Sequence, residues 1–169
     1  FRASRLEQDI LFYRNFPRID FTTTVDWRER GGPDVGVPEL KVSFAASLRG
    51  PRARFEGPFF VTERPADGLE QPTQKWLDVT GDDAGITLYN DSKYGCDVLG
   101  GRMRLTLLRN SYGPDPESDN GLHVVRWGLQ PHSPDMPVSR IVRGGMSFNR
   151  PFIAMRAKVS RTSRPEATG

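Results

Sequence analysis

The chain has 169 residues and a formal net charge of +3, so it is long enough for one well-cored domain and too short for two. Its single cysteine, Cys96, excludes an internal disulfide, and no stretch approaches the roughly 18 apolar residues that a membrane-spanning helix needs. The basic residues do not gather into a stripe with aromatic support, so the composition does not favour nucleic-acid binding.

Several short segments in the first half of the chain have the two-residue alternation of half-buried β-strands. Asp9–Tyr13 is the first expected strand and is more continuously apolar than the others. Ile19–Trp27 alternates clearly, and Leu40–Ala46 repeats the alternation after a loop rich in Gly and Pro. We expect further strands at Phe59–Thr62, Trp76–Val79 and Ile86–Tyr89.

The second half of the chain begins with an expected β-hairpin. Cys96–Val98 and Arg102–Leu108 are its strands, and Leu99–Gly101 is its turn. His123–Leu129 gives the last clear alternation. Only Pro137–Phe148 hints at a helix, and its glycine pair weakens that interpretation because glycine is a poor helix former.

About eight or nine short strands and almost no helix predict an all-β domain, either a sandwich or a barrel. The 17 glycines and 14 prolines agree with such a turn-rich fold. We expect the domain to occupy residues 1–158 and a polar C-terminal tail to occupy residues 159–169.

The sequence contains no complete catalytic or metal-binding motif. Neither His123 nor His132 stands in a zinc-ligand pattern. His123 lies on the alternating face of a strand, so a packed or hydrogen-bonded histidine is favoured there over a metal ligand. Pro114–Gly121 faintly resembles a calcium loop without the distal glutamate; a polar loop with Asx turns is the preferred interpretation, and a weak cation site is the alternative. Cys96 has no histidine near it in the sequence and is interpreted as a small apolar residue.

The stretch LYNDSKYGCDVLGG, from Leu88 to Gly101, contains five consecutive hydrogen-bonding side chains at positions 90–94. An ordinary turn between two strands does not need five such side chains. The loop is therefore either one wall of a binding site or a structural connection that satisfies its own polar groups.

Several segments follow one another in a recognisable order: VDWRER (Val25–Arg30), LKVSF (Leu40–Phe44), FVTERP (Phe60–Pro65), QKWLDV (Gln74–Val79), LYNDSKYGCDVLGGRMRLTLLR (Leu88–Arg109), PDPESDNGLH (Pro114–His123) and LQPH (Leu129–His132). Their order and spacing resemble the C-terminal β-domain of family 38 glycoside hydrolases, the α-mannosidases, over roughly residues 8–155. NDSKYG followed by the RLTLLR hairpin is the most telling part. Cys96 is a departure, since an aromatic residue, usually Tyr, is expected there.

This resemblance implies a large antiparallel β-sandwich similar to the galactose-mutarotase-like supersandwich. It also implies a separate catalytic α/β-barrel domain upstream, which carries the zinc, its His and Asp ligands and the Asp nucleophile. We therefore expect no cofactor, metal or catalytic residue in this chain, and no hydrolysis by the chain alone. The sequence starts at Phe1 and stops shortly after FNRPF (Phe148–Phe152), which indicates a fragment or, alternatively, an atypical stand-alone gene product.

The resemblance also suggests what the chain contacts. The expected partners are the barrel domain of the parent chain and α-mannoside glycans, with neither nucleic acid nor membrane. The lone cysteine and the lack of a signal segment favour a cytoplasmic location. The alternative function is a stand-alone carbohydrate-binding sandwich without hydrolytic activity, but Trp27 and Trp127 lie on apolar faces and are expected in the core.

The loop at positions 90–95 is the candidate for contact with the sugar. Asp91 would accept hydrogen bonds from sugar hydroxyls, Asn90 and Lys93 would donate them, and Tyr94 would stack on a sugar face. The alternative is a purely structural loop in which Asp91 pairs locally with Lys93.

Overall fold

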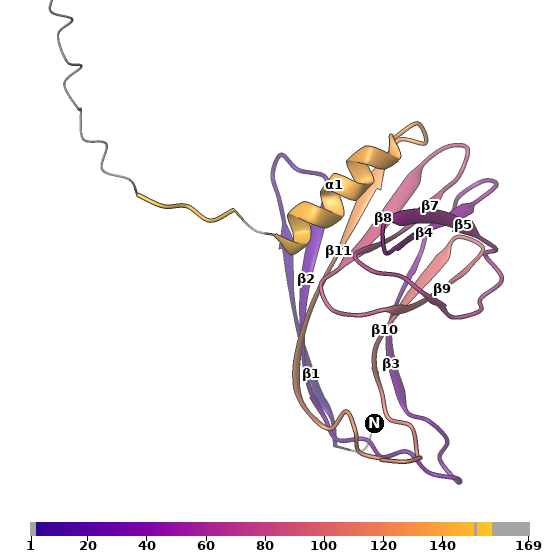
Figure 1. Ribbon diagram of the computed structural model, residues 1–169, viewed down its shortest axis with the longest axis vertical. Coiled ribbons are helices and arrows are strands. Elements are labelled where there is room, and N and C mark those ends of the chain that lie inside the picture. The colour runs from indigo at the N-terminus through magenta and orange to yellow at the C-terminus, as the bar shows by residue number, and fades with distance from the viewer. Residues whose placement is uncertain (1–2, 151, 157–169) are drawn as a thin grey trace, which may run out of the picture.

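The computed structural model describes residues 3–150 and 152–156 and folds them into a two-sheet sandwich with one helix (Figure 1). The predicted polar tail at 159–169 lies outside these residues. Among the described residues, no helix is long and apolar enough to cross a membrane. The elements are β1 (Arg5–Phe12), β2 (Ile19–Trp27), β3 (Glu39–Ala45), β4 (Arg52–Gly57), β5 (Phe60–Arg64), β6 (Gln71–Pro72), β7 (Trp76–Thr80), β8 (Gly85–Asn90), β9 (Gly95–Leu99), β10 (Arg102–Arg109), β11 (Gly121–His132) and α1 (Val138–Asn149).

The two sheets are antiparallel throughout their named pairings. The larger sheet has seven strands in the order β1-β2-β11-β8-β7-β4-β5, and the smaller has four in the order β3-β10-β9-β6. This arrangement confirms the predicted all-β sandwich. The helix is added at the end of the described fold, directly after the long strand β11.

Most predicted strands are present, and the differences have local causes. β1 begins at Arg5, earlier than the expected Asp9, and every residue of this edge strand is exposed. β4 was not predicted, because only Ala53 and Phe55 carry its alternation and arginines stand beside them. Pairing with β5 and β7 completes this strand despite its weak pattern.

The core lies between the facing sides of the two sheets. The predicted β9–β10 hairpin is confirmed, and one face of β10 is buried through Met103, Leu105 and Leu107. Trp27 and Trp127 are core residues as predicted, and the ring of Trp127 stacks on Phe21 with the centroids 3.9 Å apart. These aromatic and aliphatic contacts supply the apolar burial that stabilises the sandwich.

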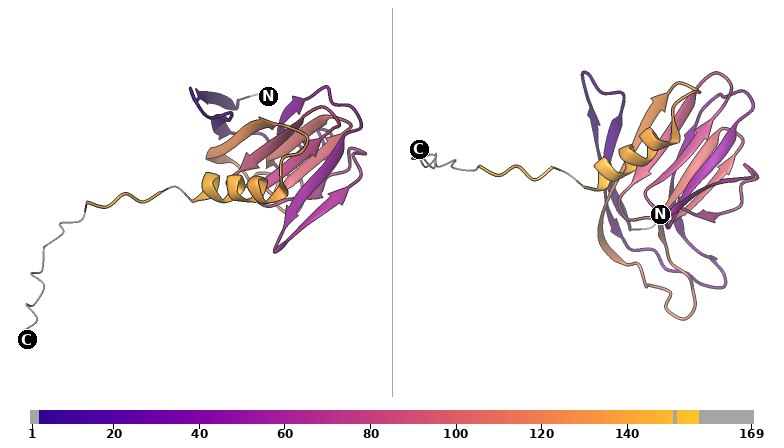
Figure 2. Two further views of the ribbon diagram at one scale, coloured as in Figure 1. Left: turned by 90° about the horizontal axis from the view of Figure 1, so that it is seen from above. Right: turned by 45° about the horizontal axis from the view of Figure 1, so that its top comes forward.

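The helix α1 lies along the outer side of the seven-stranded sheet, against β7 and β8 (Figure 2). Ile141 and Phe148 pack there on Trp76 and Tyr89. The glycine pair that weakened the helix prediction explains this close approach. A Cβ at Gly144 would collide with the Tyr89 hydroxyl, and one at Gly145 would lie 2.7 Å from the indole Cδ1 of Trp76. The helix therefore uses its glycines as a docking surface.

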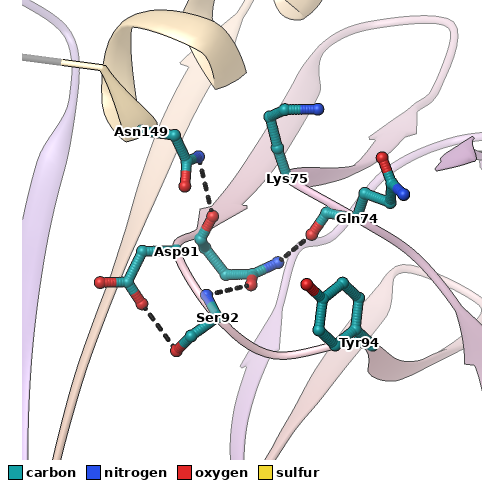
Figure 3. A pocket seen from close by; sticks show the side chains of 7 residues that line it. Gln74, Lys75, Asp91, Ser92, Tyr94 and Asn149 are labelled. Atoms are coloured by element: carbon teal, nitrogen blue, oxygen red, sulfur yellow. Dashed lines mark hydrogen bonds between the residues drawn. The ribbon is translucent and has the colours of Figure 1, made fainter. Parts of the chain in front are cut away.

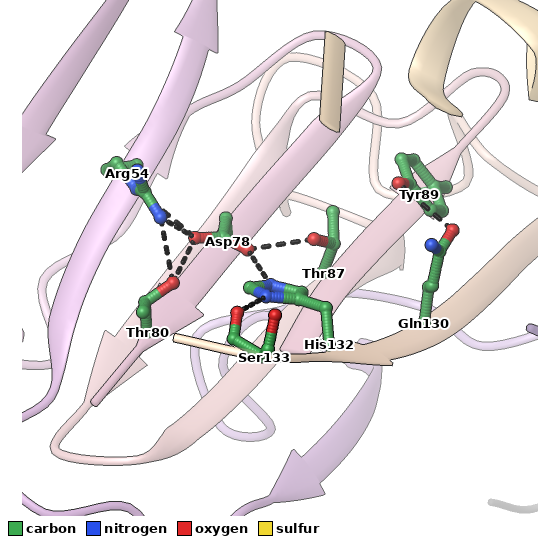
Figure 4. A network of polar contacts seen from close by, with 8 residues as sticks. All are labelled: Arg54, Asp78, Thr80, Thr87, Tyr89, Gln130, His132 and Ser133. Atoms are coloured by element: carbon green, nitrogen blue, oxygen red, sulfur yellow. Dashed lines mark hydrogen bonds and ion pairs between the residues drawn. The ribbon is translucent and has the colours of Figure 1, made fainter. Parts of the chain in front are cut away.

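A buried carboxylate, Asp78, lies on the same outer face of the sheet, next to the area that α1 covers (Figure 4). Its Oδ2 accepts hydrogen bonds from Arg54 Nη2 at 2.8 Å and from the Thr80 hydroxyl at 2.8 Å. Its Oδ1 accepts from Thr87 at 2.8 Å and contacts His132 Nε2 at 2.8 Å. A buried charge is tolerated only when it is paired and fully hydrogen-bonded, and this arrangement meets that requirement.

The ring of His132 lies between two acceptors. Nε2 faces the Asp78 carboxylate, and Nδ1 lies 2.8 Å from the backbone carbonyl oxygen of Ser133. A carbonyl and a carboxylate only accept hydrogen bonds, so the two contacts together favour the protonated imidazole, in which both ring nitrogens donate. Burial alone would lower the pKa of His132, but the bonds to Asp78 and Ser133 outweigh it and raise the pKa above its ordinary value. Burial likewise opposes ionisation of Asp78, yet the bonds from His132, Thr87 and Thr80 lower its pKa.

Replacing Gly145 with alanine should destabilise the fold. In an isolated helix the change would stabilise by about 1 kcal/mol, but overpacking against Trp76 costs about 1–3 kcal/mol. We expect the free energy of unfolding, measured by urea denaturation, to fall. Arg143→Ala, at an exposed position of the same helix, is the matched control and should leave it nearly unchanged. A Gly145→Ala protein more stable than the wild type would contradict the docking role.

The stability of the fold should decrease as the pH rises through the native pKa of His132. Below about pH 6.5 histidine is charged in both the folded and the unfolded chain, so the stabilisation by Asp78 is fully present. At higher pH the unfolded chain has lost this proton first, and the advantage disappears once the native imidazolium also deprotonates. Thermal melts between about pH 6 and 9 should show this decline in the wild type. The decline should flatten in His132→Gln and persist in His123→Gln; an equally steep decline in His132→Gln would contradict the assignment.

Candidate functional site

The candidate site is a cavity of about 220 Å³ beside the loop that follows β8 (Figure 3). Three segments that are distant in the sequence form it: the residues before β7, the loop after β8, and the last residue of α1. Only the loop is marked by a local pattern in the sequence, because the other two walls come from distant segments without such a pattern. The lining residues are Gln74, Lys75, Asn90, Asp91, Ser92, Tyr94 and Asn149.

Asn90 holds the loop in shape. Its side-chain oxygen accepts hydrogen bonds from the backbone N–H of Ser92 at 3.2 Å and of Lys93 at 2.8 Å, and its amide nitrogen donates to the Gln74 carbonyl at 2.8 Å. This is an Asx turn fastened to the neighbouring segment. Asn90 is only 1% exposed, so its amide is engaged within the protein.

Asp91 is paired across the sheet. Its Oδ2 accepts from Arg126 Nε at 3.0 Å, and its Oδ1 accepts from the backbone N–H of Arg126 and from the Ser92 hydroxyl. The predicted alternative, a local pair of Asp91 with Lys93, is wrong because β11 supplies the partner instead. The ammonium group of Lys93 makes no ion pair within the described residues.

The other two walls are also fixed by hydrogen bonds. The Lys75 ammonium contacts Glu56 at 2.9 Å, and the backbone N–H of Lys75 donates to the same carboxylate at 2.7 Å. Asn149 donates to the backbone carbonyl of Asn90 at 3.0 Å, which joins the end of α1 to the loop. The pocket thus has a stable base of backbone and amide contacts.

Tyr94 is the aromatic side chain of the site, and 64% of it is exposed. With Gln74, Lys75, Asp91 and Ser92 it offers donors, acceptors and one apolar ring face. Such a set suits a neutral polyhydroxylated ligand, which needs many hydrogen bonds and one apolar contact. No group of three or more His, Cys, Asp and Glu residues in the described part of the chain is placed to hold a metal ion.

Three residues considered in the sequence analysis lie away from this pocket and have structural contacts. His123 hydrogen-bonds through Nε2 to the carbonyl of Asp119 at 2.7 Å, as a packed histidine. Asp115 accepts from the backbone N–H of Glu117, which is the predicted Asx turn of the Pro114–Gly121 loop. Cys96 is fully buried, and burial raises the pKa of its thiol to about 12, so it is a small apolar core residue.

Comparison with known proteins agrees with this fold. The sequence pattern described as "Glycosyl hydrolases family 38 C-terminal domain" matches residues 1–117. Alpha-mannosidase 2C1 of Mus musculus is 31% identical over 162 residues, 91% of this chain, and Alpha-mannosidase G of Dictyostelium discoideum is 32% identical over 155 residues, 87% of this chain. The chain spans only 15% and 14% of the length of these two relatives.

Solved structures show the same architecture. A protein of glycosyl hydrolase family 38 from Enterococcus faecalis superposes with a TM-score of 0.72 and 19% identity, over 85% of this chain and 18% of that chain. An alpha-mannosidase from Enterococcus faecalis V583 superposes with a TM-score of 0.70 and 18% identity, over 85% and 17% of the respective chains. At this identity the likeness establishes the sandwich fold. The sequence match over residues 1–117 and the identity to the relatives show that this chain belongs to the glycosyl hydrolases of family 38, as a C-terminal domain of that family.

Proposed function

We propose that this domain is the β-sandwich portion of an α-mannosidase-like glycoside hydrolase that cleaves terminal α-mannosides. Relatives named alpha-mannosidases support this proposal, since they align with 87–91% of the chain. They are also several times longer than the matched segment, so the proposed reaction belongs to a catalytic domain elsewhere in the parent protein. Zinc is part of that proposal as a group of the catalytic domain.

The pocket beside loop 90–94 is the proposed point of contact with the glycan. The observation that supports this proposal is that polar side chains from three segments surround one exposed aromatic ring, that of Tyr94. Asp91 and Ser92 would accept from sugar hydroxyls, Lys75 would donate to them, and Tyr94 would cover an apolar ring face. Lys93, predicted as a donor, is not among the residues that line the pocket. Asn90, predicted as a donor, has the role of holding these neighbours in position.

The size of the pocket indicates a supporting contact. Pockets that enclose a small-molecule ligand usually measure about 300–1,000 Å³. The volume here is about 220 Å³, so the pocket suits part of one sugar residue whose other faces are bound elsewhere. The domain therefore is proposed to pack beside the catalytic domain and to hold one flank of the glycan.

The isolated chain should not hydrolyse an aryl α-mannoside, with or without added zinc, whereas the parent protein should. The reason is that the proposed catalytic groups lie outside this chain. Release of the aryl group, followed by absorbance for equal molar amounts of both proteins, measures this difference. Zinc-dependent hydrolysis by the purified chain would contradict the proposal.

In the parent protein, Asp91→Ala and Tyr94→Ala should each lower kcat/KM for an aryl α-mannoside by about 3- to 10-fold, the loss of one hydrogen bond or ring contact. Tyr94→Ala should change the stability little, because Tyr94 is mostly exposed. Asp91→Ala should lower it by about 1–3 kcal/mol, because the mostly buried carboxylate also accepts from the Arg126 backbone N–H and the Ser92 hydroxyl. Tyr112→Ala is the matched control, since Tyr112 is 56% exposed and lies in the loop before β11. An unchanged kcat/KM with a large drop in melting temperature would favour a purely structural loop.

A further inference from the structure

Phe59, at the tip of the β4–β5 hairpin, combines two unfavourable properties. It is fully exposed, and its φ of 68° makes it the only non-glycine residue with positive φ among the described residues. L-residues with bulky side chains are strained in this left-handed region. A contact within the described chain does not offset the strain, since the ring is exposed on all sides.

The turn itself does not call for phenylalanine. Pro58 and Phe59 are its two central residues, between the paired Gly57 and Phe60. With proline first and a positive φ second, this is the type II arrangement, in which glycine or asparagine is the unstrained choice at the second position. Phenylalanine is therefore an unfavourable residue for this backbone conformation, and residues with such strained dihedral angles cluster at functional sites.

The hairpin tip is closely packed at its base. The ring of Phe60 lies directly over Gly57, so closely that a Cβ at position 57 would collide with it. Phe60 is itself 51% exposed. The tip thus presents one fully exposed ring, Phe59, on a turn that is braced by the ring of Phe60.

The tip is also attached to the wall of the candidate pocket. Glu56, directly before Gly57, accepts through its backbone carbonyl from the Gln74 N–H at 3.0 Å. Its carboxylate holds both the backbone N–H and the ammonium group of Lys75. Because Gln74 and Lys75 line the pocket, hydrogen bonds through Glu56 join the β4–β5 hairpin that carries Phe59 to the pocket wall.

We propose that Phe59 is an aromatic platform for a second sugar unit of the glycan whose first unit contacts the loop 90–94 pocket. The C–H face of a pyranose ring is apolar and slightly positive, so it complements the negative face of a phenyl ring. Another domain of the parent chain is the alternative occupant, and the melting temperature of Phe59→Gly distinguishes the two, because the loss of an anchoring ring would lower that temperature. This inference rests on the proposed function and extends it to longer substrates.

The test uses the parent protein with two substrates, an aryl α-mannoside and a linear α-mannotrioside. Phe59→Gly should relieve the backbone strain and raise the melting temperature by about 2–4 °C. It should lower kcat/KM for the trioside by about 2- to 10-fold and leave that for the aryl mannoside unchanged. Phe59→Trp is the control that keeps a ring, and it should retain the trioside rate.

The outcomes separate this inference from the proposed function. If the parent protein hydrolyses neither substrate, the proposed function fails and the platform fails with it. If it hydrolyses both, but Phe59→Gly leaves the ratio of the two kcat/KM values unchanged, only the platform is overturned. A lower melting temperature in Phe59→Gly would also overturn it, because the ring would then be an anchor on another domain.

Discussion

The contact between α1 and the outer face of β7 and β8 is the constraint on which the candidate site depends. Gly144 and Gly145 let the helix backbone approach Tyr89 and Trp76 closely. The last residue of the helix, Asn149, consequently reaches the backbone carbonyl of Asn90 and closes one wall of the pocket. Any movement of α1 away from the sheet would remove that wall, so the geometry of the site depends on the packing of the helix.

The buried charges serve the same arrangement. Both faces of β7 are covered, one by the core and the other by α1 and the Asp78 network, as the complete burial of Trp76–Thr80 shows. A buried ion pair contributes little net stability, since desolvation offsets most of the attraction. The bonds of His132 to Asp78 and Ser133 instead fix the end of β11, from which the chain turns into α1. The network therefore anchors the end of the strand that leads into α1.

How far the sequence predicts this structure depends on the range of the interaction. Strands such as Ile19–Trp27 are predictable because their alternation is a local signal that burial of one face obeys. The helix is only weakly predicted, because the low helix propensity of glycine is a local signal, whereas the contact of Gly145 with Trp76 that favours the helix is tertiary. Likewise the loop was visible through its residues and its family resemblance, but the partner of Asp91 was not, since Arg126 comes from a distant strand.

The segment Thr73–Lys75 connects the parts that the proposals join. Its backbone N–H groups bond to Tyr94 O, Glu56 O and the Glu56 carboxylate, and the carbonyls of Gln74 and Lys75 accept from Asn90. These polar backbone groups are thus used to hold the loop on one side and the hairpin on the other. The backbone that carries the exposed rings at positions 94 and 59 is joined to this segment, so in the proposed complex little backbone ordering would accompany glycan binding. Such preorganisation lowers the entropy lost on binding, which is how a shallow contact can still contribute usefully to substrate affinity.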